Sequence, residues 1–170
     1  MSNSEKTDPV LKIVSYYVYN VKMVCGIQNR NVTEACTPAD PNSAGNPVLS
    51  PGIYSTEVNI FNFHDEMKAQ VSKYFVPLVI ENRTIGLEPE QQKATPLASI
   101  VLEPNSATMD DCCIISQSLK GKNLLSVGFL KIVSNISLAV TAVYTVSDLE
   151  NRVVGIEVEQ INEMTDRLIL

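Results

Sequence analysis

The sequence predicts an all-β fold: a two-sheet antiparallel β-sandwich, jelly-roll or immunoglobulin-like in kind, with about eight strands and one short helix near 106–120. Runs rich in Val, Ile and Tyr recur along the chain, as is typical of strands. Several of them alternate apolar and polar residues with the two-residue period of a half-buried strand, and Pro, Gly and Asn turn signals separate them. With 170 residues and 45% hydrophobic content, the chain is long enough for one domain with a core.

The first element is a strand region at residues 10–26, which follows a polar N-terminal arm at residues 1–9. Its apolar positions change from even to odd numbers near Asn20, and a bulge or a bend between two strands would produce this change. The arm is not followed by the apolar core of an ordinary signal peptide, so we do not expect one.

The clearest strand follows the turn dipeptide Pro51-Gly52. Because successive side chains of a strand point to opposite sides, one mostly apolar face is expected to carry Tyr54, Thr56, Val58, Ile60 and Asn62. The run ends at His64, the only histidine of the chain, beside Asp65 and Glu66. A carboxylate can orient an imidazole as a base or ligand, but sequence neighbours on an extended chain face apart. We therefore expect a solvated turn here.

Two irregular segments and two strands occupy the middle of the chain. Residues 28–52 lack any period and predict a long loop, while residues 81–96 form a connection rich in Glu, Gln and Pro. Residues 73–80 and 97–102 read as strands. Pro77 cannot donate a ladder hydrogen bond, which predicts a sheet edge or a bulge at that position.

The segment at 106–121 is ambiguous. Ser106 or Asp110 could cap a short helix that stops at Gly121. Calcium is the alternative reading, because hard oxygen ligands are available on Glu103, Asn105, Asp110 and Asp111, but a helix cap explains the aspartates as well.

The last third of the chain has the clearest strand signal. Residues 124–133 and 136–146 flank Ser134-Asn135, which predicts a hairpin with a two-residue turn. A turn at residues 148–152 leads to a strand at 153–161, on which Val154, Ile156 and Val158 lie opposite Glu157 and Glu159. The domain is thus expected to span residues 10–161. A tail at residues 162–170 ends on three apolar residues that should dock in this subunit or a neighbouring one.

Several of these strands resemble an uncharacterised bacterial family of small all-β proteins. That family has the motifs Pro-Gly-x-Tyr-x-Thr-x-Ile-Asn and Ala-Val-Tyr-Thr, and the matching residues here begin at Pro51 and Ala142. The similarity covers residues 16–161 and implies one β fold, without a known activity to transfer. Phe61 stands where the family has a histidine, which argues against carrying over a histidine metal site.

Four cysteines are candidates for disulfides within the chain or between copies: Cys25, Cys36, Cys112 and Cys113. Their spacing matches no zinc pattern. Buried free thiols, acting as small apolar side chains, are the simpler interpretation. If Cys112 and Cys113 are oxidised, each should pair elsewhere, because a disulfide between neighbours strains the peptide that joins them. Oxidised cysteines would favour a cell or spore surface over the cytoplasm.

Charge and motifs exclude several functional classes. A net charge of −6 with 13 scattered Lys and Arg residues argues against nucleic acid as a partner. Neither a nucleophile motif nor a phosphate loop is present, so we expect no cofactor, no metal and no enzyme activity, and no stretch reads as a membrane helix. An enzyme that uses His64 with its acidic neighbours is the weakest alternative.

Two functional hypotheses remain. Only 19% of residues are charged, and strand edges must be covered or paired, which favours a self-assembling structural subunit that forms a filament, coat or surface layer. Its partners would be other copies of itself, joined through strand edges, the arm or the tail and reinforced by disulfides. The alternative is a monomeric module that binds a protein or glycan ligand through the loops at 28–52 and 81–96.

Overall fold

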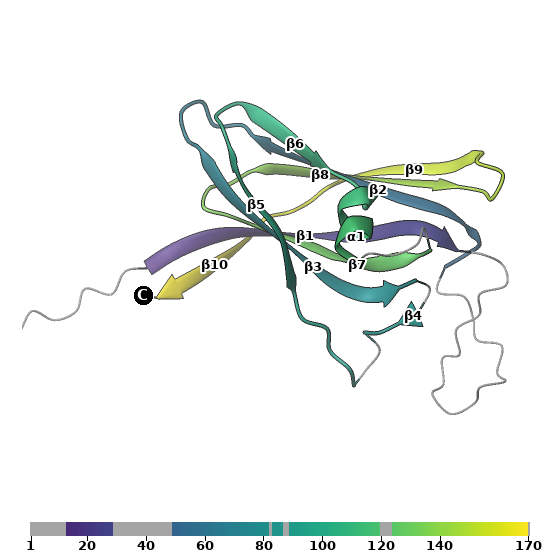
Figure 1. Cartoon of the computed structure of the whole chain (residues 1–170). Coiled ribbons are helices and arrows are strands. Elements are labelled where there is room, and N and C mark those ends of the chain that lie inside the picture. The colour runs from purple at the N-terminus through teal and green to yellow at the C-terminus, as the bar shows by residue number, and fades with distance from the viewer. Residues whose placement is uncertain (1–12, 29–48, 82, 87–88, 120–123, 170) are drawn as a thin grey trace, which may run out of the picture.

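The chain is all-β, as predicted, and its strands are arranged as a sandwich (Figure 1). The computed structural model describes residues 13–28, 49–81, 83–86, 89–119 and 124–169. Within these residues there are ten strands and one helix: β1 (Ile13–Gln28), β2 (Gly52–Asn62), β3 (Ala69–Ile80), β4 (Arg83–Thr84), β5 (Thr95–Leu102), β6 (Ser106–Asp110), α1 (Cys112–Leu119), β7 (Ser126–Ser134), β8 (Ala139–Ser147), β9 (Val153–Gln160) and β10 (Met164–Ile169).

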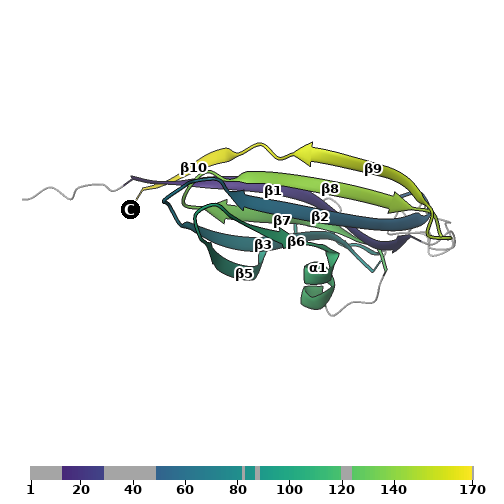
Figure 2. The same cartoon turned by 90° about the horizontal axis from the view of Figure 1, so that it is seen from above.

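The strands form two antiparallel layers that share β1 (Figures 1 and 2). In the first layer β5 and β4 lie beside β3, which is followed by β7, β1 and β10. In the second layer β6 lies beside β2, which is followed by β8 and β9. The layers meet where Gly26–Gln28 of β1 pair with Gly52–Tyr54 of β2.

The core lies between the layers and is built from alternate residues, as the two-residue period requires. The predicted apolar face of β2 is confirmed, since Thr56, Val58, Ile60 and Asn62 are buried and Tyr54 is half-buried. The other strands contribute the buried apolar side chains of Tyr19, Val21, Met23, Val71, Phe75, Leu130, Ile132, Val140 and Ala142.

The change of phase near Asn20 does not mark a bulge or a break. β1 is one strand, and its register with β7 is uninterrupted from Tyr17 to Cys25. Val18 and Tyr19 are sequence neighbours that point to opposite faces, and both are buried. The apolar pattern therefore changes parity because β1 is covered on both faces at this point.

The hairpin predicted around Ser134-Asn135 is wrong. β7 pairs with β1 and β3, whereas β8 pairs with β2 and β9, so the chain passes from one layer to the other between these strands. Asn135 serves the first layer instead, because its Oδ1 accepts a hydrogen bond of 2.7 Å from the backbone N–H of Gln70. The segment is a corner between the sheets.

The bulge predicted at Pro77 is confirmed. The register of β3 with β7 shifts between Pro77 and Val79. On its other side, β3 pairs with β5 only as far as Phe75, and pairing with β4 begins at Val79. Pro77 thus lies in the gap between β5 and β4, where no ladder hydrogen bond is needed from it.

The last third of the chain contains the predicted turn before β9 and the segment that was predicted as a tail. The predicted turn is confirmed: Asp148 Oδ1 accepts hydrogen bonds of 2.9 Å from the backbone N–H groups of Glu150 and Arg152, and the turn leads into β9. The segment predicted as a tail forms β10, which pairs with β1 from Val18 to Ile13. It docks on its own chain.

Candidate functional site

The stretch from Pro51 to Asp65 ends in a hydrogen-bonded hub around Asn62, which is fully buried. The Nδ2 group of Asn62 faces the backbone carbonyls of Met67, Leu102 and Glu103 at 2.7, 3.3 and 3.0 Å. Its Oδ1 accepts a hydrogen bond of 3.2 Å from the backbone N–H of His64. One side chain thus fixes both the β2–β3 and the β5–β6 connections, which indicates a structural role.

His64 is not placed for acid–base chemistry with its acidic neighbours. Its Nε2 lies 3.0 Å from the carbonyl oxygen of Ser137, so this nitrogen carries the proton and donates it. Asp65 Oδ1 instead accepts a hydrogen bond of 3.0 Å from the Nδ2 group of Asn105. The hydrogen bond of the His64 imidazole thus links the turn after β2 to the corner between β7 and β8.

The cysteines divide into a pair and a free thiol. Cys25 of β1 and Cys112 of α1 form a disulfide across a sequence separation of 87. Cys113 is exposed and free, and the neighbouring Asp111 carboxylate raises the pKa of its thiol. Cys36 lies outside the described residues. The neighbours Cys112 and Cys113 do not pair with each other, as expected.

Thr56 secures the junction beside this disulfide. β1 and β2 pair directly only at Gly26–Gln28, and farther along Thr56 Oγ1 replaces the backbone ladder. It accepts a hydrogen bond of 3.0 Å from the N–H of Val24 and donates one of 3.1 Å to the Val24 carbonyl oxygen. The Thr56 N–H faces Cys112 Sγ at 3.2 Å. The backbone N–H and carbonyl oxygen of Val24 therefore both have hydrogen-bond partners, and Thr56 holds the two layers together where they separate.

The oxygen ligands proposed for calcium have other partners. Asp111, and not Ser106 or Asp110, caps α1, since its Oδ1 accepts a hydrogen bond of 2.8 Å from the Cys113 N–H. Residues 106–110 form β6. Glu103 pairs with Lys68 at 2.8 Å. Within the described ranges, no three His, Cys, Asp or Glu side chains are grouped to hold a metal ion.

A buried ion pair is the most unusual feature that sequence reasoning missed. Lys73 Nζ lies 2.7 Å from Asp110 Oδ2, and the two side chains are only 3% and 7% exposed. Lys73 shares its strand face with the buried residues Val71 and Phe75. The alternation of this strand could therefore have predicted that Lys73 is buried, but the sequence gives no indication that Asp110 is its partner.

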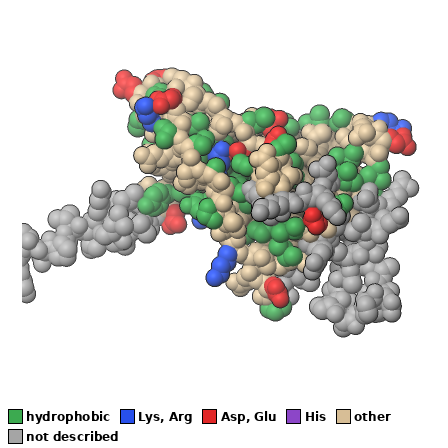
Figure 3. Space-filling model, viewed as in Figure 1, with side chains coloured by type: hydrophobic (Ala, Val, Ile, Leu, Met, Phe, Trp, Pro, Cys, Tyr) green, Lys and Arg blue, Asp and Glu red, His purple; other side chains and the backbone are tan. Residues whose placement is uncertain are grey.

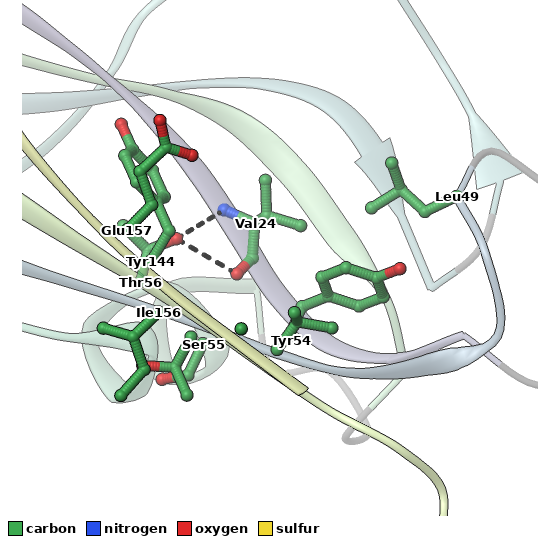
Figure 4. Close-up of a pocket in the computed structure, with 11 residues that line it drawn as sticks. Val24, Leu49, Tyr54, Ser55, Thr56, Tyr144, Ile156 and Glu157 are labelled. Carbon is green, nitrogen blue, oxygen red and sulfur yellow. Dashed lines mark hydrogen bonds between the residues drawn. The ribbon is translucent and has the colours of Figure 1, made fainter. Parts of the chain in front are cut away.

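A cavity of about 370 Å³ opens beside the β1–β2 junction (Figure 4). Tyr54, Tyr144 and Glu157 are among its polar lining residues, and Val24 and Leu49 are among its apolar ones. Burial and the carboxylate of Glu159, which accepts a hydrogen bond of 3.0 Å from the Tyr144 hydroxyl, raise the pKa of Tyr144 to about 12. The cavity could hold a small apolar group next to hydrogen-bonding partners.

Strand β9 is the second candidate site. We define the β9 stripe as Val154, Ile156 and Val158, whose exposed fractions are 65%, 66% and 65%. β9 pairs with β8 on one side, and no described strand lies along its other side. The opposite face of β9 carries Glu157 and Glu159, which are also exposed. β9 therefore offers both an open hydrogen-bonding edge and an apolar surface.

Charged side chains are sparse on the molecular face seen in Figure 3, where they lie singly or in small groups among apolar and uncharged groups. Within the described residues, no helix combines the length and the apolar character needed to cross a membrane. Comparisons with family models, curated proteins and solved structures give no match to this chain. The resemblance to the bacterial β family stays a prediction.

Proposed function

We propose that the chain is a non-enzymatic structural subunit that self-assembles through the open edge of β9. The observation that carries the proposal is the β9 stripe, three apolar side chains about two-thirds exposed on an eight-residue edge strand. Natural sheets usually protect such edges with charge, proline or a covering segment. On β9 the charged residues Glu157 and Glu159 lie on one face only, and the face that carries the stripe has no charge or proline, which supports pairing with another strand.

A second copy of β9 fits this edge in one antiparallel register. If Ile156 lies opposite Ile156 of the partner, Glu157 faces Gly155 instead of a like charge, and Val158 approaches Val154, which is the bulged residue of β9. The apolar residues then form a continuous patch on one face, and the glutamates are staggered on the other. Such an isologous contact generates a twofold dimer.

A second contact would extend dimers into a filament, coat or surface layer. At the other end of the sandwich, β1 from Ile13 to Tyr16 pairs with β10 alone, because its pairing with β7 starts at Tyr17 (Figures 1 and 2). Two-stranded ribbons are marginal by themselves, so a neighbouring strand would stabilise this one. The polar arm, residues 1–9, lies outside the described residues and is our candidate for that strand.

The test is the mass of the protein in solution, measured by light scattering across a concentration series. Ile156→Lys should abolish association, because it places a charge in the centre of the stripe. Val101→Lys is the matched control, since Val101 is 58% exposed on the edge strand β5, and it should leave association unchanged. Equal behaviour of the two variants, or a strictly monomeric wild type at high concentration, contradicts the proposal.

The arm is tested separately. Deleting residues 1–9 should leave a folded dimer that forms no larger polymers by electron microscopy. Unchanged polymers would remove the arm from the assembly while leaving the β9 contact intact.

Disulfides between copies can reinforce the assembly only through cysteines that do not belong to the Cys25–Cys112 disulfide. Cys25 and Cys112 bond to each other, so covalent ladders on a non-reducing gel should depend on Cys36 or Cys113. Ladders that persist when both are replaced by serine would contradict this assignment.

The cavity at the β1–β2 junction supports a second candidate function, a monomeric module that binds a protein or glycan ligand. Of the two loops predicted for this role, the one at 28–52 contributes Leu49 to the described lining. A panel of glycans and peptides, screened by thermal shift, would test it. Binding to a monomeric wild type that is lost in Tyr54→Ala but kept in Tyr74→Ala favours the module over the assembly.

A further inference from the structure

The Lys73–Asp110 pair joins the two layers through the core. Lys73 belongs to β3, between Ile132 of β7 and Ala98 of β5. Asp110 ends β6, opposite Val58 of β2. Among the described residues, these two are the only charged side chains that are buried. The pair is therefore isolated from solvent.

The pair is close but poorly arranged as a salt bridge. Although Lys73 Nζ is 2.7 Å from Asp110 Oδ2, this oxygen has no partner in hydrogen-bonding geometry within the described part of the chain. A buried ion pair offsets the cost of desolvation only when its geometry is good and its remaining hydrogen-bonding groups are satisfied. The surroundings therefore favour an uncharged product.

We propose that Lys73 and Asp110 condense to form an intramolecular amide. The ammonium first gives one proton to the carboxylate, which yields a neutral amine and a neutral acid. The lone pair of Lys73 Nζ then attacks Asp110 Cγ, a C–N bond forms, a C–O bond breaks, and the departing oxygen leaves as water with two protons. Atoms and charge balance without an oxidant, reductant or co-reactant.

Fixed proximity supplies the driving force for this step. Groups held in contact by a folded scaffold reach effective concentrations on the order of 10⁵ M or more, which offsets the low reactivity of a free carboxyl group towards an amine. The product removes both charges from the core and leaves an amide in their place.

The amide would add a covalent link between the sheets. The disulfide already fastens Cys112 to β1, only two residues from Asp110. Together, the two links would anchor the segment from β6 to α1 to both strands β1 and β3. This inference depends on the buried pair alone and stands or fails independently of the assembly through β9.

The test is intact mass measurement of the full chain after denaturation and reduction, followed by peptide mapping. We expect the wild type to be lighter than its sequence by one water, and we expect a branched peptide that joins the Lys73 and Asp110 segments. The full sequence mass, with Lys73 and Asp110 found in separate unmodified peptides, overturns the proposal.

Two variants identify the source of any water loss. Lys73→Arg keeps the positive charge but removes the nucleophile, and Asp110→Ala removes the carboxyl group, so each should have its full sequence mass. Water loss that persists in Lys73→Arg would come from a reaction of the aspartate alone and would also overturn the proposal. If either variant fails to fold, the wild-type peptide map still decides.

Discussion

The hydroxyl group of Tyr19 contacts both the backbone N–H and the backbone carbonyl oxygen of Leu138. It accepts a hydrogen bond of 2.7 Å from the Leu138 N–H, and it lies 3.0 Å from the Leu138 carbonyl oxygen, to which it can donate. Glu163 Oε2, at 3.2 Å, competes for the same proton. The contact spans 119 positions of sequence and fixes the corner at which the chain enters β8.

Replacing this hydroxyl should therefore weaken the whole sandwich. We expect Tyr19→Phe to lower the free energy of unfolding by about 1–3 kcal/mol, because it leaves the buried backbone groups of Leu138 without their partner. Urea denaturation measures the change. Tyr17→Phe is the control, since no described residue bonds to its hydroxyl, and equal losses in both variants would contradict the role given to Tyr19.

Asn62 gives a second prediction about the connections at this end of the sandwich. Asn62→Ala removes the donors that face three backbone carbonyls and the acceptor of the His64 N–H. We expect it to cost about 1–3 kcal/mol in urea denaturation, the usual cost of unsatisfied buried groups.

The matched control for Asn62 is on the same strand. Among the described residues, the side chain of Asn59 bonds only to the carboxylate of Glu57, at 2.8 Å on the outer face. Asn59→Ala should change stability by less than about 0.5 kcal/mol. Equal losses of stability in Asn59→Ala and Asn62→Ala would contradict the structural role assigned to Asn62.

The strand pattern could be predicted because period and turn chemistry are local. The buried face of β2 and the bulge at Pro77 both follow from residues within one strand. Whether β7 and β8 pair with each other does not, because the corner between them is set by Tyr19, more than a hundred positions away. Ser134-Asn135 also lacks the glycine that marks a strong two-residue turn.

In the candidate sites, too, local features could be predicted from the sequence and long-range contacts could not. Alternation placed Ile156 and Val158 on the face opposite Glu157, but parity alone does not say which face of a strand is covered. β9 is the edge strand of its layer, and its residues are exposed on both faces. The disulfide was one of several open pairings until the fold brought Cys25 and Cys112 together, because spacing does not determine connectivity.

The Cys25–Cys112 disulfide should contribute strongly to stability. It closes a loop across a sequence separation of 87, and loss of a disulfide with a loop of this length costs about 2–5 kcal/mol. We expect the double variant Cys25→Ser, Cys112→Ser to unfold at correspondingly lower urea concentration. Cys113→Ser, which changes an exposed free thiol, should match the wild type. A stable double variant would indicate that packing alone holds α1 in place.

Tyr144 gives a prediction about pH. Its pKa is raised from 10.0 to about 12, first by burial and then by Glu159. Because the folded state holds the phenol proton more tightly than the unfolded state, the associated stability is fully present below pH 10 and is lost as the pH rises through the folded pKa. Glu159→Gln should lower the pKa towards 10.0 but not to it, since burial is the larger cause.

Ultraviolet titration of tyrosinate measures this pKa, and subtraction of the Tyr144→Phe curve isolates Tyr144 from the other tyrosines. Glu157→Gln is the comparison, because Glu157 acts on Tyr144 only as a neighbouring charge and is the smallest cause of the shift. It should lower the pKa less than Glu159→Gln does. The reverse order would mean that the hydrogen bond between Tyr144 and Glu159 is not formed in solution, and that the wall of the cavity beside β9 is arranged differently.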